Sequence, residues 1–186
     1  MEIIIAENSG FCFGVKRSVD LAHEALDSKR DKYTVGPLIH NPQLVEKLES
    51  QGLKVLTKEQ ALKIKDSLIV IRAHGESAEF KQALLNNGNE ILDATCPVLG
   101  NIYKKITEKE KEGYQVIIVG DPDHPEIIGM DSYLKNGIIV DDETEAKNIK
   151  SEKPLYVVSQ TTNRADFYYD IANTLKENDG SVVINN

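Results

Sequence analysis

Two cysteines, Cys12 and Cys96, have the setting in this sequence that most clearly indicates chemistry. Each follows a short apolar run and precedes a segment with helical spacing, in "AENSGFCFGVKRS" and "ILDATCPVLGNIYKK". The first amides of a helix favour the thiolate, which is the form of cysteine that binds metals. Gly10 and Gly14 let the backbone approach a bulky group, and Pro97 suits the first turn of a helix. We therefore predict that both cysteines are metal ligands, although free cysteines are commonly buried core residues.

An internal repeat relates the two cysteines. They lie 84 residues apart, and the segments "VGPLIHNPQLV" and "VGDPDHPEIIG" also begin 84 residues apart. Each cysteine is consequently followed 28 residues later by a histidine, His40 or His124. Further along the repeat, His74 aligns with Thr161. The segment "NEILDATC" aligns with "GSVVINN", so the repeat predicts a third cysteine about one to three positions past Asn186.

The spacing of the cysteines favours an iron–sulfur cluster over zinc. Zinc sites usually contain close ligand pairs such as C-x2-C or H-x3-H, and the sequence has none. Isolated thiolates from successive repeats suit a central cluster, and three protein ligands would leave one iron open to substrate. Cys12 and Cys96 would be two of these ligands, and the cysteine expected past Asn186 would be the third.

Three of the four histidines, His40, His74 and His124, lie where predicted strands end. Imidazoles that converge on one cavity can bind an anionic group and change their charge near neutral pH. A single histidine in a turn is usually a surface residue, so the prediction depends on the repeat. His23 lies within the helix predicted after the first cysteine, and we interpret it as a non-functional helix residue.

Three further polar residues are candidates for catalysis or substrate binding. Glu126 lies two residues after His124 and could relay protons, or its role could be limited to the first turn of the helix that Pro125 begins. Thr161 and Thr162 follow a predicted strand and could hold a substrate hydroxyl, or they could cap the following helix. The two interpretations are compatible in both cases.

Alternating strands and helices predict an α/β fold. Apolar runs predict strands at residues 2–6, 33–36, 68–73, 90–94, 114–120, 137–140, 155–159 and 181–185, and helical spacing predicts helices at residues 15–29, 57–66, 77–88, 124–134 and 163–177. This alternation indicates open, mostly parallel sheets with flanking helices, and ligands of such sheets gather at the carboxyl ends of the strands. The repeat predicts two lobes of a pseudo-three-lobed fold, residues 1–96 and 97–186, the second ending with the start of a third unit.

The composition narrows the class of protein. The chain has 186 residues, a hydrophobic fraction of 40% and a charged fraction of 28%, as ordinary globular proteins do. It shows neither a long apolar run nor a basic secretory leader, so we expect a cytoplasmic protein without a membrane span. A net charge of −8 argues against nucleic-acid binding, although a local pocket can still bind an anionic small molecule. A disulfide between the two cysteines is not expected in the cytoplasm.

Other classes of protein explain the sequence less well. A cysteine-dependent phosphatase would use an anion-binding loop with a C-x5-R spacing, whereas Cys12 and Arg17 are spaced as C-x4-R. A zinc or redox-sensing module does not fit the cysteine spacing. A catalytically silent two-lobed fragment or scaffold remains the alternative for this chain by itself.

Together the motifs resemble the LytB-type 4-hydroxy-3-methylbut-2-enyl diphosphate reductases. The matching pieces are "GFCFGV", "HN" at residues 40–41, "AHG" at 73–75, "DATCP" at 93–97, "HPE" at 124–126 and "QTT" at 160–162. They occur in the family's order along the whole chain. The resemblance implies a three-lobed cytoplasmic bacterial enzyme around an oxygen-sensitive 4Fe–4S cluster.

The resemblance also implies a reaction and a role for each residue. The family removes the allylic hydroxyl of its diphosphate substrate with two electrons and two protons, forming isopentenyl and dimethylallyl diphosphates in the non-mevalonate pathway. A ferredoxin or flavodoxin would donate the electrons. By motif, the cluster ligands would be Cys12 and Cys96, the diphosphate and substrate cavity would be lined by His40, His74, His124 and Thr162, and the catalytic residues would be Glu126, Thr161 and His124.

Family members are longer than this chain, and their third cysteine lies in the additional part. We therefore expect that the 186-residue chain alone holds no complete cluster and does not turn over. Anaerobic reconstitution followed by iron–sulfur absorbance tests this expectation, and a stable, fully occupied 4Fe–4S signal would contradict it. The coding sequence after Asn186 tests the repeat, which predicts a cysteine within the next few codons.

Overall fold

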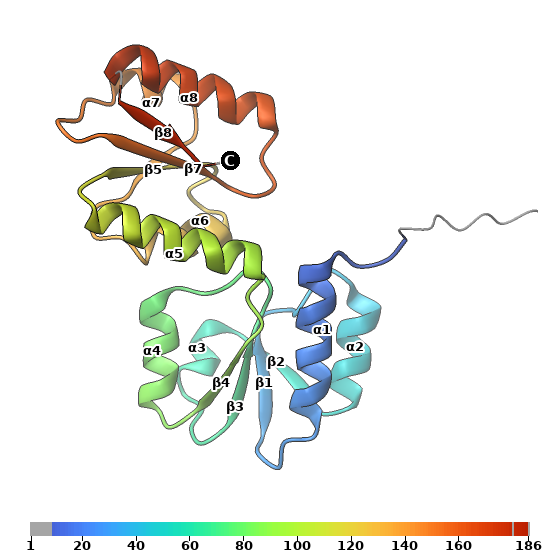
Figure 1. Cartoon of the computed structure of the whole chain (residues 1–186). Helices are drawn as coiled ribbons and strands as arrows, with labels where there is room; N and C mark the ends of the chain where they lie inside the picture. The colour runs from blue at the N-terminus through green and yellow to red at the C-terminus, as the bar shows by residue number, and fades with distance from the viewer. Residues whose placement is uncertain (1–8, 180, 186) are drawn as a thin grey trace, which may run out of the picture. The chain divides into compact units, whose positions relative to one another are not determined.

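The computed structural model describes residues 9–179 and 181–185, which form two compact units (Figure 1). Of these residues, unit 1 comprises 9–73 and 84–97, and unit 2 comprises 74–83 and 98–185 without residue 180. His74 thus belongs to unit 2. The domain boundary expected after residue 96 stays a prediction. The strand expected at residues 2–6 lies outside the described residues.

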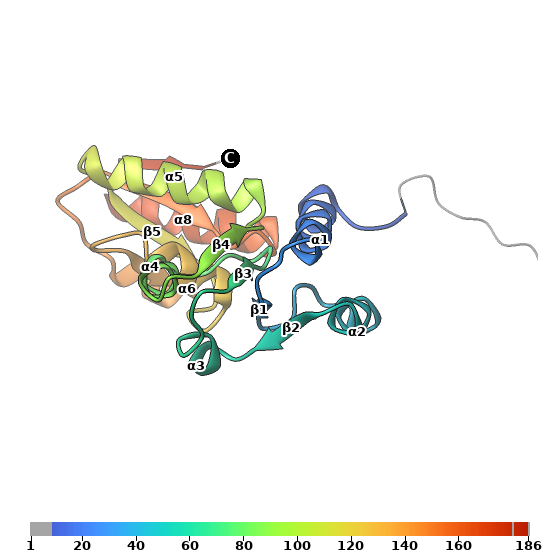
Figure 2. The ribbon, with the colours of Figure 1, turned by 90° about the horizontal axis from the view of Figure 1, so that it is seen from below.

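Unit 1 is built on a four-stranded parallel sheet with the order β2-β1-β3-β4. Its strands are β1 (Lys32–Val35), β2 (Leu53–Leu56), β3 (Leu68–Ile71) and β4 (Glu90–Asp93), and its helices are α1 (Phe13–Leu26), α2 (Pro42–Ser50), α3 (Lys58–Ala61) and the end of α4 (Ala78–Asn86). Helices α1 and α2 cover one face of the sheet (Figure 2), where their apolar side chains pack against β2 and β3.

Unit 2 repeats this topology, with the strand order β6-β5-β7-β8 and parallel pairing throughout. Its strands are β5 (Gln115–Val119), β6 (Ile138–Val140), β7 (Leu155–Ser159) and β8 (Val182–Ile184), and the helices of the second repeat are α5 (Pro97–Lys111), α6 (Pro125–Asp131), α7 (Glu143–Asn148) and α8 (Ala165–Asp179). The buried side chains of α7 and α8 pack together against β5 and β7. The prediction of repeated, open, parallel α/β units is confirmed.

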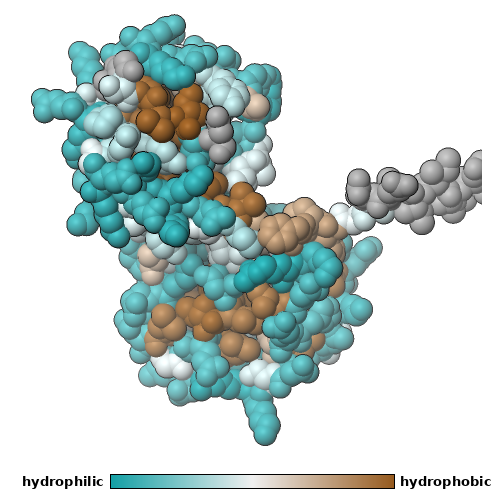
Figure 3. All heavy atoms as spheres, viewed as in Figure 1, coloured by the Kyte–Doolittle hydropathy of each residue, from teal (hydrophilic) through white to brown (hydrophobic). Residues whose placement is uncertain are grey.

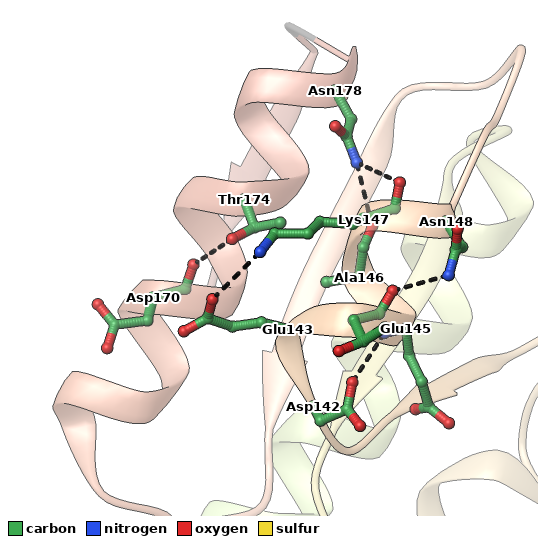
Figure 4. Close-up of polar contacts among 10 residues, drawn as sticks. Asp142, Glu143, Glu145, Ala146, Lys147, Asn148, Asp170, Thr174 and Asn178 are labelled. Carbon is green, nitrogen blue, oxygen red and sulfur yellow. Dashed lines mark hydrogen bonds and ion pairs between the residues drawn. The ribbon is translucent and has the colours of Figure 1, made fainter.

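Helix α7 shows how a six-residue helix is stabilised at both of its ends (Figure 4). At its start, the side chain of Asp142 accepts a hydrogen bond from the amide of Glu145 at 2.8 Å. At its end, the side-chain amide of Asn178 on α8 donates to the carbonyls of Ala146 and Lys147, each at 3.1 Å. These bonds satisfy backbone groups that have no partner within such a short helix.

The sequence patterns missed three elements and overextended a fourth. Strand β2 and helices α2 and α7 were not predicted. The apolar patterns of β2 and α7 span too few residues. Helix α2 does carry the usual signals of a helix start, Asn41 as the N-cap and Pro42 at the first position, which could have indicated it. The helix expected at residues 57–66 is only α3, which a capping box between Thr57 and Gln60 begins. Within the described part of the chain, no helix is long and apolar enough to cross a membrane.

Each unit has a hydrophobic surface over its last strand. Brown side chains gather over β4 in unit 1 and over β8 in unit 2 (Figure 3). Both strands are at the edge of their sheet, and Val183 of β8 is 42% exposed. Among the described residues, no further strand pairs with the outer side of β4 or β8, and such an edge can pair with another strand.

Tyr168 of α8 connects this helix to the ends of two strands. Its hydroxyl lies 2.8 Å from the carbonyl oxygen of Val157 and 3.2 Å from that of Asn185. Burial raises the pKa of Tyr168 far above the usual value for tyrosine, because the charged phenolate would be poorly solvated there.

We expect Tyr168→Phe to lower the free energy of unfolding by about 1 kcal/mol near neutral pH, since a buried hydrogen bond is lost. The stabilisation by the neutral hydroxyl is complete below about pH 10, the unfolded pKa, and decreases as the pH rises above it. Urea unfolding at several pH values measures both effects, with Tyr169→Phe on the exposed side of α8 as control. Equal alkaline losses of stability in the wild type and Tyr168→Phe would contradict the assignment.

Candidate functional site

Both cysteines lie in unit 1, at the starts of equivalent helices. Cys12 is the N-cap residue of α1 and is exposed, whereas Cys96 directly precedes α5 and is half-buried. The Cys96 amide donates to the carbonyl of Ala73 at 2.9 Å, which extends the pairing of β3 and β4. The prediction that Pro97 begins a helix is confirmed.

Gly14 brings these two segments into direct contact. A Cβ atom placed on Gly14 would lie only 2.6 Å from Sγ of Cys96, so no larger residue fits here without a shift of the thiol. The thiol of Cys96 therefore packs against the first turn of α1, two residues from Cys12. The structure thus brings together the two segments that the sequence predicts to supply thiolate ligands.

A carboxylate and a hydroxyl that are 35 residues apart in sequence meet in unit 2. Oε2 of Glu126 accepts a hydrogen bond from the hydroxyl of Thr161 at 2.9 Å, and Oε1 accepts one from the Thr161 amide at 2.7 Å. Glu126 lies in the first turn of α6 and is 3% exposed, whereas Thr161 follows β7 and is exposed. A buried carboxylate is thus linked to the hydroxyl of an exposed threonine.

His124 is the N-cap residue of α6, and Pro125 takes the first helical position as predicted. Nδ1 of His124 accepts a hydrogen bond from the amide of Glu126 at 3.2 Å. In the neutral ring the proton must then reside on Nε2, which can donate to a ligand. This cap fixes the histidine beside the carboxylate that binds Thr161.

Thr162 and Thr161 do not cap α8, because this helix begins only at Ala165. The exposed hydroxyl of Thr162 instead accepts a hydrogen bond from the side-chain amide of Gln160 at 2.7 Å. The capping alternative for the two threonines is therefore wrong. Gln160, which is buried, lies in the "QTT" motif but was given no role from the sequence, and here it supports Thr162.

His74 follows β3 and belongs to the same unit as His124. Its carbonyl oxygen lies 3.5 Å from the hydroxyl of Tyr103 on α5. Tyr103 in turn packs against α6, where a Cβ on Gly129 would lie 2.5 Å from the tyrosine hydroxyl. The backbone of His74 is thus packed against the helix pair that includes the Glu126 turn.

His40 is exposed and lies in unit 1, directly before the N-cap of α2. That cap is Asn41, whose side chain accepts from the amide of Leu44 at 3.0 Å. The loop between β5 and the cap of α6 is one residue shorter than the loop between β1 and the cap of α2. His124 is therefore itself the cap, whereas His40 lies one residue before the cap. A cavity of about 430 Å³ lies beside His40, lined mainly by residues of this loop and of α2.

The described residues include no group of three or more histidine, cysteine or acidic side chains placed to hold a metal ion. The direct contacts join Gly14 with Cys96, and Glu126 with His124 and Thr161. His23 is exposed in the last turn of α1. These contacts group Glu126, His124 and Thr161 in unit 2 and bring together the segments of the two cysteines in unit 1.

The chain is thus a repeated parallel α/β protein in which Cys96 follows β4, the last strand of the first repeat. The model of the family described as LytB protein matches residues 3–186. The chain therefore belongs to the LytB family, which confirms the resemblance seen in its motifs.

Two curated relatives of the chain are both 4-hydroxy-3-methylbut-2-enyl diphosphate reductases. The chain is 41% identical over 180 residues to the 4-hydroxy-3-methylbut-2-enyl diphosphate reductase of Caldanaerobacter subterraneus subsp. tengcongensis, covering 95% of this chain and 62% of that protein. It is 39% identical over 176 residues to the reductase of the same name from Aquifex aeolicus, covering 92% and 60%.

Two solved structures share the fold. A structure of (E)-4-hydroxy-3-methyl-but-2-enyl diphosphate reductase, described as the terminal enzyme of the non-mevalonate pathway, matches with a TM-score of 0.87 and 37% identity, covering 99% of this chain and 66% of that one. The structure of the E-1-hydroxy-2-methyl-but-2-enyl-4-diphosphate reductase from Plasmodium falciparum also matches with a TM-score of 0.87, at 27% identity, covering 96% of this chain and 57% of that one. The chain spans about 60% of the length of the curated relatives it matches.

The contact at Gly14 makes a direct prediction. We expect Gly14→Ala to lower the free energy of unfolding by about 1–3 kcal/mol, because the new methyl group overlaps Sγ of Cys96. Gly100→Ala on α5 is the matched control, since a Cβ there meets open space and alanine favours the helix by about 0.5–1 kcal/mol. Denaturant unfolding of both variants measures the difference. Equal stability of the two variants would contradict the packing of Cys96 on α1.

Proposed function

We propose that this chain supplies two repeats of an enzyme that reductively removes the allylic hydroxyl of 4-hydroxy-3-methylbut-2-enyl diphosphate. The products would be isopentenyl and dimethylallyl diphosphates, the end products of the non-mevalonate pathway. The observation that carries the proposal is the pair of hydrogen bonds from Thr161 to the buried carboxylate of Glu126. The names of the relatives and the order of the shared motifs support the choice of substrate.

The Glu126–Thr161 pair is suited to deliver a proton to a leaving oxygen. In the resting arrangement the threonine hydroxyl donates to the carboxylate. With Glu126 protonated, the hydrogen bond reverses, and the threonine hydroxyl is free to donate to the substrate oxygen. The C–O bond then breaks, and the oxygen leaves as water with the bonding electron pair. Two electrons from the electron donor and a second proton from solvent complete the product, and Glu126 replaces the proton on Thr161.

The histidines would bind the diphosphate end of the substrate. Because Nδ1 of His124 accepts from the Glu126 amide, the neutral ring carries its proton on Nε2 and can donate a hydrogen bond to the diphosphate without a positive charge. We assign His40 and His74 to the same anion-binding role from the motifs, together with the hydroxyl of Thr162.

The thiols of Cys12 and Cys96 would hold two irons of a 4Fe–4S cluster. They fit this group because soft thiolates are its protein ligands and because Gly14 leaves space where a Cβ would collide with Cys96. The third thiolate is the cysteine expected past Asn186. When bound, the cluster supplies electrons and a Lewis-acidic iron for the leaving oxygen. A ferredoxin or flavodoxin is our proposed donor, and the cytoplasm our proposed location.

Activity of the full product of the gene tests the role of Glu126. Purified anaerobically and supplied with a chemical reductant, the protein should convert the allylic diphosphate to the two products. We expect Glu126→Gln to lower kcat by about 10²-fold or more with unchanged iron content, since the proton donor is lost. Glu152→Gln, an exposed position in the loop before β7, is the control. Activity of Glu126→Gln within twofold of wild type would overturn the proposed relay.

A further inference from the structure

The loop that presents Cys96 is held by a side chain from α1. Nη1 of Arg17 donates to the carbonyl of Thr95 at 3.2 Å, and its Nη2 donates to the carbonyl of Asp93 at 3.4 Å. These carbonyls belong to the last residue of β4 and to the residue directly before Cys96. Arg17 lies five residues after Cys12, on the helix that Cys12 caps.

The loop is also ordered from within. Oδ1 of Asp93 accepts from the amide of Thr95 at 2.9 Å and from its hydroxyl. This turn orients the Thr95 carbonyl, and the planar guanidinium of Arg17 can serve two carbonyls at once. A lysine offers a single ammonium group and could not bridge both positions in the same way.

Unit 2 contains a related arrangement. Nζ of Lys105 on α5 donates to the side-chain oxygen of Asn185 at 3.0 Å, and the hydroxyl of Tyr156 donates to the same oxygen at 2.9 Å. Asn185 directly follows β8, as Thr95 shortly follows β4. In each unit, therefore, a cationic side chain of the first helix contacts the chain that leaves the fourth strand.

We propose that Arg17 is a positioning residue that fixes the Cys96 thiol relative to Cys12. It connects the helix capped by one cysteine to the loop that presents the other, without touching either sulfur in the described contacts. This inference rests on the proposed function, in which both thiolates bind the same cluster and must therefore lie close together. The connection itself is a property of the protein without its cluster, so it can be tested separately.

Hydrogen exchange of the Cys96 amide tests whether Arg17 orders the loop. This amide donates to the carbonyl of Ala73 at 2.9 Å and is protected as long as the loop stays in place. We expect Arg17→Gln to accelerate its exchange by roughly tenfold to a hundredfold, the effect of losing one hydrogen bond to a charged group. Arg17→Lys should fall between this variant and wild type. Unchanged exchange in Arg17→Gln overturns the inference.

Lys16→Gln is the matched control, because it removes the same charge from the neighbouring residue. Lys16 pairs with Asp20 at 2.6 Å on the exposed side of α1. Hydrogen exchange of the Cys96 amide in Lys16→Gln should equal that in wild type. Equal acceleration in Lys16→Gln and Arg17→Gln would mean that helix charge alone sets the loop order, and would overturn the inference.

Cadmium binding by the cluster-free protein tests the effect on the thiols, because Cd²⁺ binds soft thiolates and its thiolate absorbance can be titrated. We expect wild type and Lys16→Gln to bind one Cd²⁺ through both cysteines, and Arg17→Gln to bind it about fivefold more weakly. If wild type binds Cd²⁺ with only one thiolate, the proposed cluster site fails. If wild type and Arg17→Gln bind equally, only the positioning role of Arg17 fails.

Discussion

Parallel pairing of all described strands is the constraint on which the placement of the site depends. In a parallel sheet the carboxyl ends of all strands lie at the same end of the sheet, so residues that follow neighbouring strands are brought close together. Thr161 follows β7 and Glu126 lies in the loop-and-helix start after β5, and these two strands are neighbours. Their hydrogen bonds are a direct result of this topology.

The starts of the helices determine how the functional groups are presented. His124 caps α6 with its own ring, which aligns the imidazole beside Glu126. In unit 1 an asparagine takes the capping role, and the histidine before it is left exposed to a cavity. At the start of α1 the absence of a side chain on Gly14 is what allows the thiol of Cys96 to approach. Small changes in loop length and side-chain size thus place the corresponding residues of the two repeats in different surroundings.

Much of this could be predicted from the sequence, because the strongest signals are repeated. The long apolar strands, Pro97 at a helix start and the contact between the segments of Cys12 and Cys96 agree with the patterns. Strand β2 and helix α7 could not be predicted, because they are too short to show a periodic pattern, whereas α2 has a recognisable start at Asn41 and Pro42. The end of α7 depends on Asn178, which lies about thirty residues further along the chain.

Supporting residues were the least predictable part of the site. Gln160 lies in the "QTT" motif, but its residue type predicts no particular role, and Tyr103 has no unusual sequence context. Arg17 stands out only by a spacing that does not fit the phosphatase pattern. Tyr103 and Arg17 each donate to a backbone carbonyl that is distant in sequence, whereas Gln160 donates to the hydroxyl of Thr162, two residues further along. Such partners are determined by the register of strands and helices, which a single sequence does not specify.

The central claim is that Cys12 and Cys96 bind one and the same iron–sulfur cluster. Iron content and electron paramagnetic resonance of the full gene product, reconstituted anaerobically, measure this most directly in the wild type and in Cys12→Ser and Cys96→Ser. The account predicts that either substitution alone lowers the bound iron and changes the signal of the reduced cluster. A substitution of either cysteine that leaves the iron content and the signal unchanged would contradict it.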